Sequence, residues 1–181
     1  MSWNVQEYPT RALVSCLSPV DKVERWHLEL ASRMFEIIEH GDRRGVGLAA
    51  NQVGAEVCMF VWLVNGEGDI VFNPEIIDRS SRTSVMQEGC LSLPASFLVN
   101  VQRPDWIVVR WMDRGGVVHE DRIGEGGKWD SFTARVWHHE IDHLNGLSIV
   151  DTMSGSSKRK KRTQLASIME RRRLLDQDDP K

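Results

Sequence analysis

The sequence has few cysteines and no hydrophobic run long enough to cross a membrane. Its three cysteines, Cys16, Cys58 and Cys90, are odd in number and widely spaced, which argues against a disulfide framework and favours reduced thiols. A transmembrane helix needs about 20 apolar residues, and near the N-terminus no basic segment leads into an apolar one. We therefore expect a cytoplasmic protein, in which one cysteine can serve as a metal ligand.

The length and charge of the chain predict one domain with a basic end. With 181 residues there is room for one compact hydrophobic core, whereas two full domains would be cramped. The formal net charge of -3 conceals basic residues gathered between Lys158 and Arg162 and again near Arg171. We expect one domain over residues 1–153 and a basic C-terminal helix and tail over residues 154–181, where a polyanion would bind.

The spacing His139-Glu140-x-x-His143 is the pattern of a metal-binding helix that carries a base. Residues four apart lie on one face of a helix, so both imidazoles can bind a single cation. Glu140 lies a short step around the same helix, beside the ligands. The pattern alone could also arise by chance among six histidines.

A catalytic cation usually has three protein ligands, and the two histidines leave one to be found. Cys90 is the best candidate, because a thiolate with two imidazoles is an attested ligand set that leaves the fourth position for water. Cys16, near the N-terminus, and Cys58, in a strand predicted to be buried, are weaker candidates. The alternative is that Cys90 is a buried small hydrophobic residue, as most lone cysteines are.

Hydrophobic periodicity predicts helices near both ends of the chain and strands in its middle. The first helix is expected to begin at Ser18-Pro19, to end at Gly41, and to leave His27 and His40 in solvent. The small residues at 45–54 fit either a strand along the substrate or a tight turn. The other expected elements are strands at 57–64, 69–73, 75–79, 106–112 and 117–122, the metal-motif helix capped by Ser131 or Thr133 and stopped at Asn145-Gly146, an extended exit at 148–151, and a terminal helix at 158–175.

Three stretches, taken in order, resemble the three signature motifs of the peptide deformylases. They are Gly-Val-Gly-Leu-Ala-Ala-Asn-Gln at 45–52, Glu-Gly-Cys-Leu-Ser at 88–92 and His-Glu-Ile-Asp-His at 139–143. Each motif alone is weak or moderate, but the ordered triple is specific, and the resemblance extends over roughly residues 8–175. It implies an α+β fold in which antiparallel strands pack around a central metal-binding helix, with an N-terminal and a C-terminal helix.

The resemblance implies that the domain at 1–153 hydrolyses the N-formyl group from the initiator methionine of nascent chains and releases formate. A bound divalent metal would lower the pKa of its water. Glu140 would take the proton of that water, while the Gln52 amide and the Leu91 N–H would stabilise the oxyanion. Ferrous iron is the implied ion, replaceable by nickel, cobalt or zinc, although ligand geometry alone favours zinc. The implied metal ligands are Cys90, His139 and His143.

The resemblance also implies how N-formyl-Met peptides and nascent chains are bound. Their backbone would pair like an added strand, so that main-chain contacts accept many sequences. The residues implied for this pairing are Gly45, Val46, Gly47 and Gly89. The residues implied for the methionine pocket are Met86, Phe132, Arg135 and Val136.

Three positions depart from the family pattern. His138 stands where the family usually has glutamine, and we expect it to pack beside the ligands rather than to bind the metal. Arg135 stands where relatives commonly have an aliphatic residue, so either its guanidinium reaches water or the pocket is more polar than usual. A family arginine is absent near Phe97, which puts contacts to longer substrates in doubt. Asp142 is expected to pair with Arg103 rather than to bind the metal.

Two other functions remain open from the sequence. A zinc endopeptidase with the same His-Glu-x-x-His motif would usually take its third ligand downstream, where only Glu170 is available. A non-catalytic RNA- or ribosome-binding module would keep the metal for stability and bind through the basic run that begins at Lys158 and ends at Arg162. In a deformylase, the same run is a candidate ribosome contact.

Overall fold

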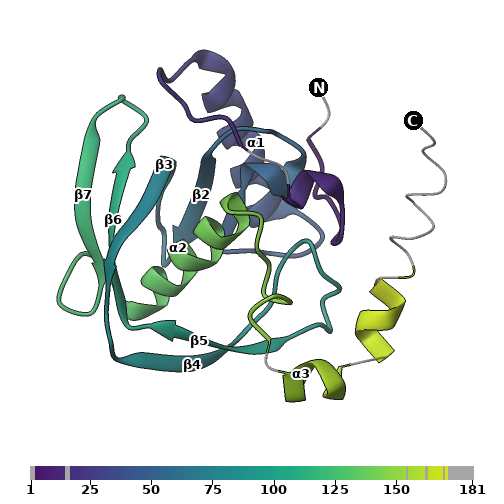
Figure 1. The fold of residues 1–181 in the computed structure, drawn as a ribbon. Coiled ribbons are helices and arrows are strands. Elements are labelled where there is room, and N and C mark those ends of the chain that lie inside the picture. Colours follow the sequence, from purple (N-terminus) through teal and green to yellow (C-terminus); the bar gives the residue numbers. More distant parts are fainter. Residues whose placement is uncertain (1–2, 15–16, 154, 162, 169, 171–181) are drawn as a thin grey trace.

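The structure, a computed structural model drawn in Figure 1, describes residues 3–14, 17–153, 155–161, 163–168 and 170. Its main sheet has five antiparallel strands in the order β1-β2-β3-β6-β7, and a separate two-stranded ribbon pairs β4 with β5. Helix α2 packs against both (Figure 1). Among the described residues, no helix has the length and apolar character needed to cross a bilayer. The elements are η1 (Arg11–Val14), α1 (Arg25–His40), β1 (Gly47–Ala49), η2 (Ala50–Val53), β2 (Met59–Val64), β3 (Glu67–Arg79), β4 (Thr83–Glu88), β5 (Val99–Pro104), β6 (Trp106–Met112), β7 (Val118–Gly124), α2 (Ser131–Leu144) and α3 (Gly155–Lys160).

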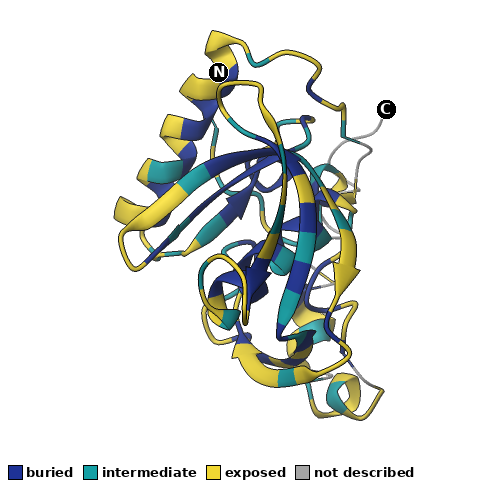
Figure 2. Cartoon of the chain, turned by 90° about the vertical axis from the view of Figure 1, so that its left-hand side faces the viewer, coloured by how far each residue is buried: buried dark blue, intermediate teal, exposed yellow. Residues whose placement is uncertain are grey.

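Alternating residues of β2 bring the two long helices to opposite faces of the sheet. Met59 and Val61 are buried in a core with α1, whereas Phe60 and Trp62 are buried in a second core with α2. This follows because successive side chains of a strand point to opposite faces. Figure 2 shows α1 with one buried and one exposed side. Fully burying one such side chain stabilises a fold by about 1.5–3 kcal/mol, so β2 anchors both layers.

The first helix begins later than its sequence predicts. α1 starts at Arg25 after the N-cap Glu24, whose backbone N–H donates to His27 Nδ1 at 2.9 Å. Ser18 instead forms a backbone bridge with Val57, and this pairing replaces the predicted helix start. The predicted place of His27 in solvent is also wrong. His27 is only 5% exposed, because its ring closes the cap.

Most strands and turns in the middle of the chain are confirmed. The observed β2, β6 and β7 match the predicted strands to within two residues at each end. Residues 69–79 form one bulged strand, β3, rather than two strands. The segment 45–54 contains both of its predicted alternatives, because the short strand β1 runs directly into the turn η2. α1 ends at Gly41 with His40 exposed, as predicted, but the exit at 148–151 forms turns rather than an extended segment.

Helix α2 begins where it was expected, but with a different cap. Its N-cap is Asp130 rather than Ser131 or Thr133. The Asp130 Oδ1 accepts from the backbone N–H of Thr133 at 2.8 Å and from its hydroxyl at 2.9 Å. A carboxylate at this end also interacts favourably with the helix dipole. At the other end the backbone becomes left-handed at Gly146, with φ of 72°, which is the predicted stop.

The C-terminal part is not one continuous helix in the structure. α3 covers Gly155–Lys160, Lys161 lies in a turn, and residues 163–168 are helical again. Ile168 is 4% exposed and packs in a core with Met153, so this part is docked against the preceding domain. Outside the described residues lie Cys16, Arg162, Arg171 and the end of the predicted terminal helix at 171–175.

Candidate active site and metal centre

Cys90, His139 and His143 form a compact group of potential metal ligands. One atom from each, a sulfur or a ring nitrogen, lies within 4.8 Å of the other two. The Cys90 Sγ is 3.2 Å from His143 Nε2. The two histidines lie four residues apart on α2, so their rings share one side of the helix. In the part of the chain that the structure describes, this is the only such group.

The donor set of this group fits a divalent cation. Burial by itself would raise the pKa of the Cys90 thiol, but the neighbouring His143 and His139 rings lower that pKa well below its usual value. The sulfur is therefore held as a thiolate, which is the form that binds metals. A thiolate with two imidazoles leaves a fourth position for water or substrate, as in catalytic rather than structural zinc sites. Several first-row metals accept this set of ligands.

The buried Glu88 carboxylate connects the ligand group to the β4–β5 ribbon. It accepts hydrogen bonds from His139 Nδ1 at 2.9 Å and from two Arg103 nitrogens at 2.7 and 2.9 Å. Burial would raise the pKa of Glu88, but the bonds from His139 and Arg103 bring it well below its usual value. Burial would likewise lower the pKa of His139, whereas hydrogen bonds with Cys90 and Glu88 raise it to about 10. Glu88 therefore orients the His139 ring towards Cys90.

Arg135 belongs to the same network and does not reach solvent. Its guanidinium donates to Glu88 Oε1 at 2.7 Å and to the carbonyl oxygens of Val101 and Ser84 at 3.0 and 2.8 Å. The residue is 4% exposed, so the alternative in which its guanidinium reaches water is wrong. The backbone of the ribbon and Glu88 satisfy the guanidinium instead. Arg135 still lines the cavity, but its charge is neutralised by Glu88.

Arg103 links the same network to the far end of the metal motif. It pairs with Asp142 at 2.8 Å, as the sequence predicted, and its side chain is 2% exposed. The same guanidinium nitrogen lies 2.6 Å from His138 Nδ1. His138 and Asp142 are thus held by Arg103 and are not members of the ligand group, which agrees with their predicted supporting roles.

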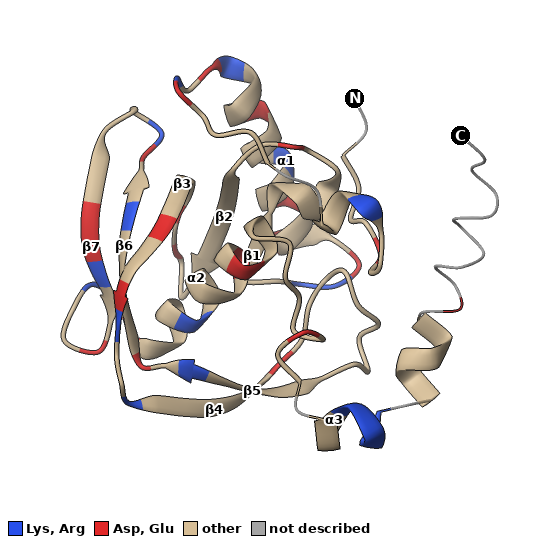
Figure 3. Ribbon diagram, in the orientation of Figure 1, with Lys and Arg blue, Asp and Glu red and all other residues tan. Residues whose placement is uncertain are grey.

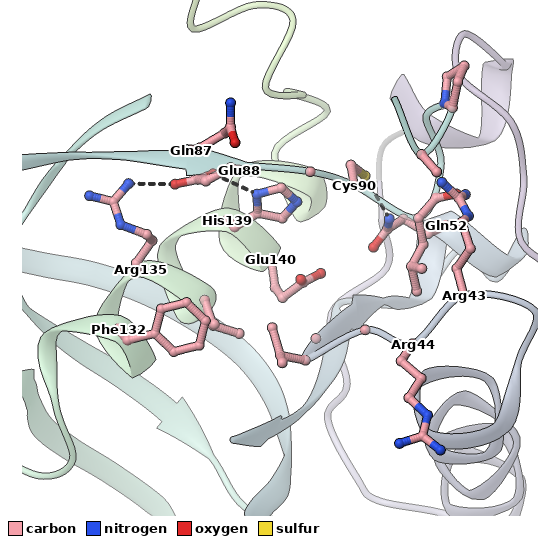
Figure 4. Close-up of a pocket in the computed structure, with 18 residues that line it drawn as sticks. Arg43, Arg44, Gln52, Gln87, Glu88, Cys90, Phe132, Arg135, His139 and Glu140 are labelled. Carbon is pink, nitrogen blue, oxygen red and sulfur yellow. Dashed lines mark hydrogen bonds and ion pairs between the residues drawn. The ribbon is translucent and has the colours of Figure 1, made fainter. Parts of the chain in front are cut away.

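Glu140 is buried beside the ligand group, where it can act as a base. It is 4% exposed, and burial raises the pKa of its carboxyl to about 7. Its Oε2 is enclosed by protein and has no hydrogen-bond partner among the described residues, so no donor holds the carboxylate at this oxygen. A Cβ added to Gly47 would lie 2.5 Å from the other oxygen, so the glycine makes room for the carboxylate. Figure 4 shows Glu140 pointing from α2 into the cavity.

Two potential hydrogen-bond donors lie beside Cys90. The Gln52 Oε1 accepts from the Ala49 N–H at 2.8 Å, which fixes the orientation of its amide. The amide nitrogen is thereby turned to Cys90 Sγ at 3.3 Å and to Ser92 Oγ at 3.2 Å. The Leu91 N–H has no hydrogen-bond partner within the described ranges. Both groups are therefore placed to bind a negative charge that develops near the sulfur.

A cavity of about 610 Å³ opens between the segment around Gly45, the segment around Cys90 and helix α2 (Figure 4). Met86, which was predicted to line it, does not. This residue lies on β4 and is 44% exposed, whereas Gln87 forms part of the wall. The remaining predicted contact residues do line the cavity, namely Gly45, Val46, Gly47, Gly89, Phe132, Arg135 and Val136.

Sequence reasoning assigns no role to several residues that the structure places at the cavity, and two of them, Glu88 and Arg43, make hydrogen bonds there. Glu88 stands in the second motif, but its partners come from β5 and α2, which only the fold brings together. Arg43 donates to the carbonyl oxygens of Leu91 and Leu93. Its only signal in the sequence is its position two residues before the first glycine of the motif at 45–52.

Comparisons with known proteins agree with this geometry. The family model described as "Polypeptide deformylase" matches residues 3–159. The chain is 38% identical over 159 residues to the peptide deformylase of Thermotoga neapolitana, a match that covers 87% of this chain and 85% of that protein. It is 34% identical over 179 residues to the peptide deformylase of Rhizorhabdus wittichii, covering 93% and 94% of the two chains. The crystal structure of peptide deformylase from Thermotoga maritima superposes with a TM-score of 0.76 at 34% identity, covering 85% of this chain and 99% of that one.

The contact between Gly47 and Glu140 predicts the effect of adding one methyl group. In Gly47→Ala, the new Cβ would overlap Glu140 Oε1 and push the carboxylate away from its place. We expect turnover of a formyl-Met peptide to fall by roughly a hundredfold, which is within the range for loss of a general base, with unchanged metal content. The control is Gly155→Ala, where an added Cβ meets nothing within 4 Å. Normal turnover in Gly47→Ala would contradict the assigned position of Glu140.

Proposed function

The chain belongs to the polypeptide deformylase family, and from that membership we propose how its residues share the steps of the reaction. The protein is a metal-dependent hydrolase that removes the N-formyl group from nascent polypeptides. The observation that supports our assignment is one cavity lined by Cys90, His139, Glu140 and Gln52. The products are formate and a polypeptide with a free amino terminus.

We assign the metal to Cys90, His139 and His143, and proton transfer to Glu140. A divalent cation bound there would supply a Lewis acid that lowers the pKa of a water molecule. Glu140 would accept the proton of the attacking water at its carboxylate, whose Oε2 has no donor among the described residues. Its pKa of about 7 suits a group that first takes up a proton and then returns it to the departing amine nitrogen.

We assign the stabilisation of the oxyanion to Gln52 and Leu91. Attack on the formyl carbon turns its carbonyl oxygen into an oxyanion, which needs hydrogen-bond donors in place before the charge develops. The Gln52 amide is held by the Ala49 N–H, so its own N–H groups need little reorganisation. Losing one such donor typically lowers kcat by about 10²- to 10³-fold.

The substrate backbone is assigned to the open edge of β1 and to Gly89. β1 lies at the end of the five-stranded sheet, so an extended peptide can pair with it as an additional strand. Phe132 and Val136 would contact the methionine side chain. Arg135 contributes only its stem to this pocket, because its guanidinium is bonded to Glu88. A preference for formyl-Met over charged first residues follows from this arrangement.

We also propose a cellular compartment and domain boundaries for this enzyme. Nascent chains are made in the cytoplasm, and we propose the same compartment for this hydrolase. We propose that residues 1–153 form the catalytic unit and residues 154–181 a basic addition. The endopeptidase alternative is less well supported, because the candidate ligand group contains the upstream Cys90 and not Glu170.

We propose ferrous iron as the bound ion, with zinc, nickel and cobalt as alternatives. Protein purified without oxygen should contain about one iron per chain by metal analysis, and the activity should decay in air as Fe(II) or the Cys90 thiolate is oxidised. Reloading with zinc or nickel provides the comparison, because these ions do not oxidise under the same conditions. Undiminished activity of the iron-loaded protein after long storage in air would argue against iron.

The assignment of Glu140 predicts a variant that keeps its metal but loses its activity. In Glu140→Gln the amide cannot accept the proton of the water, so kcat for formyl-Met-Ala-Ser should fall by about 10²- to 10⁴-fold. Formate release and metal content are measured together, with Glu39→Gln on α1 as a matched control that removes a charge elsewhere. Near-normal turnover in Glu140→Gln would rule out this base. The unformylated twin peptide, run beside it, would reveal an endopeptidase by internal cleavage.

We further propose that the basic residues of α3 contact ribosomal RNA. Figure 3 shows Lys and Arg gathered on α3, where the basic residues are Lys158, Arg159 and Lys160. No residue of this helix is buried, so its basic side chains are accessible to an external partner. The following helical segment is fixed to the domain through Ile168, which holds α3 in place on the surface.

Neutralising α3 should weaken ribosome binding without affecting catalysis on small peptides. Changing Lys158, Arg159 and Lys160 together to Gln keeps the packing of Ile168, which deletion of the tail would remove. Binding should weaken, and the dependence of log K on log salt should become less steep by about one unit per lost phosphate contact. The matched control changes three basic residues near α1 to Gln, namely Lys22, Arg25 and Arg33. Equal ribosome binding by the two triple variants would remove this role from α3.

A further inference from the structure

One arginine joins two segments that border the cavity. Arg43 lies between α1 and β1, and its guanidinium donates to the carbonyl oxygens of Leu91 and Leu93, the latter at 2.5 Å. The two segments also touch directly, because a Cβ added to Gly45 would lie 2.9 Å from Leu91 Cδ1. In Figure 4 the guanidinium of Arg43 extends towards the Cys90 side of the cavity, whereas that of Arg44, which also borders the cavity, is directed away from Cys90. The planar guanidinium presents two nitrogens to two acceptors in a rigid fork, a geometry that a lysine ammonium lacks.

The loop after β4 is held by its carbonyl groups. All four carbonyls of residues 90–93 accept hydrogen bonds. The Cys90 carbonyl accepts from the Leu93 N–H at 3.1 Å, and the Ser92 carbonyl accepts from the Tyr8 N–H at 2.7 Å. Arg43 binds the other two. The Leu91 N–H is left without a partner among the described residues, so it is available to a ligand in the cavity.

The charge of Arg43 is not used in an ion pair. Arg103 and Arg135, the buried guanidinium groups near the cavity, both pair with Glu88. Arg43 has no acidic partner in the described part of the chain, and its bonds go to loop carbonyls. Without Arg43, two of the four carbonyl anchors of this loop would be lost. The Leu91 N–H shares its peptide plane with the Cys90 carbonyl, which the Leu93 N–H holds, so losing the Arg43 bonds would loosen the turn that fixes this peptide.

We propose that Arg43 is a positioning residue, which directs the Leu91 N–H at the oxyanion by holding the carbonyls of Leu91 and Leu93. The inference rests on the proposed function, in which that N–H stabilises the oxyanion. An interaction that is made mainly in the transition state raises kcat and changes KM little. Arg43 should therefore act on kcat, although it does not itself contact the reacting atoms.

Three variants separate this role from a general effect of charge. Arg43→Met removes both carbonyl bonds, and Arg43→Lys keeps the charge but lacks the rigid fork that spans the two carbonyls. Arg44→Met removes a neighbouring charge that is directed away from Cys90. With formyl-Met-Ala-Ser as substrate, kcat of Arg43→Met should fall roughly ten- to a hundredfold, less than or equal to the loss of a whole donor. Its KM should stay within about threefold. Arg43→Lys should be intermediate, and Arg44→Met should keep kcat within about twofold, because exposed charges are screened.

A measurement that is independent of activity tests the loop itself. Amide hydrogen exchange at Leu93, whose N–H closes the turn onto the Cys90 carbonyl, should be faster in Arg43→Met than in the unchanged protein or in Arg44→Met. Metal content and thermal unfolding are recorded for each variant. If Arg43→Met does not fold, the comparison of Arg43→Lys with Arg44→Met carries the test.

Three results would overturn the inference. They are equal kcat in the Arg43 and Arg44 variants, a loss confined to KM, and unchanged exchange at Leu93. A failure of the proposed function looks different, because the unchanged protein itself would then release no formate. An active unchanged protein with an equally active Arg43→Met therefore rejects only the positioning role.

Discussion

The geometry of the cavity depends on one buried carboxylate, that of Glu88. It accepts hydrogen bonds from Arg103 on β5 and from Arg135 and His139 on α2. Burying several charged groups costs several kcal/mol per ion unless each is paired and hydrogen-bonded. Here the remaining donors are satisfied by Asp142 and by carbonyls of the ribbon. The network therefore fixes α2 against the β4–β5 ribbon, and so sets the position of Cys90 opposite the two histidine rings.

The opposite side of α2 is held by aromatic packing. The Trp137 ring lies in edge or tilted contact with Phe60, Trp62, Trp111 and Trp129, at centroid distances from 5.3 to 6.0 Å. Such pairs contribute about 0.5–1.5 kcal/mol beyond the burial of their area. They also account for part of the high tryptophan content of the chain, which is seven residues. α2 is thus fixed to the sheet by apolar contacts and to the β4–β5 ribbon by charged hydrogen bonds. The face that carries His139 and His143 is therefore held in one orientation.

Local signals in the sequence were enough to predict the metal motif and most helices and strands. Features that depend on contacts between distant residues could not be predicted in this way. The spacing of His139 and His143 fixes their shared helix face, and Gly41 and Gly146 end their helices as predicted. The predicted start of the first helix failed because Ser18 pairs with a residue far along the chain, at Val57. The burial of Arg135 likewise could not be predicted from the sequence, because its partner Glu88 lies 47 residues away along the chain.

The two carboxylates nearest the ligand group show how the surroundings decide a role. Glu88 and Glu140 are both buried, at 8% and 4% exposure, and burial alone raises the pKa of each. Glu88 accepts hydrogen bonds from two arginines and from His139 and stays ionised, so it serves as a fixed anchor. Glu140 keeps one oxygen without a donor, and its pKa rises to about 7. Glu140 can therefore exchange protons during the reaction because its carboxylate lacks the hydrogen-bond donors that keep Glu88 ionised.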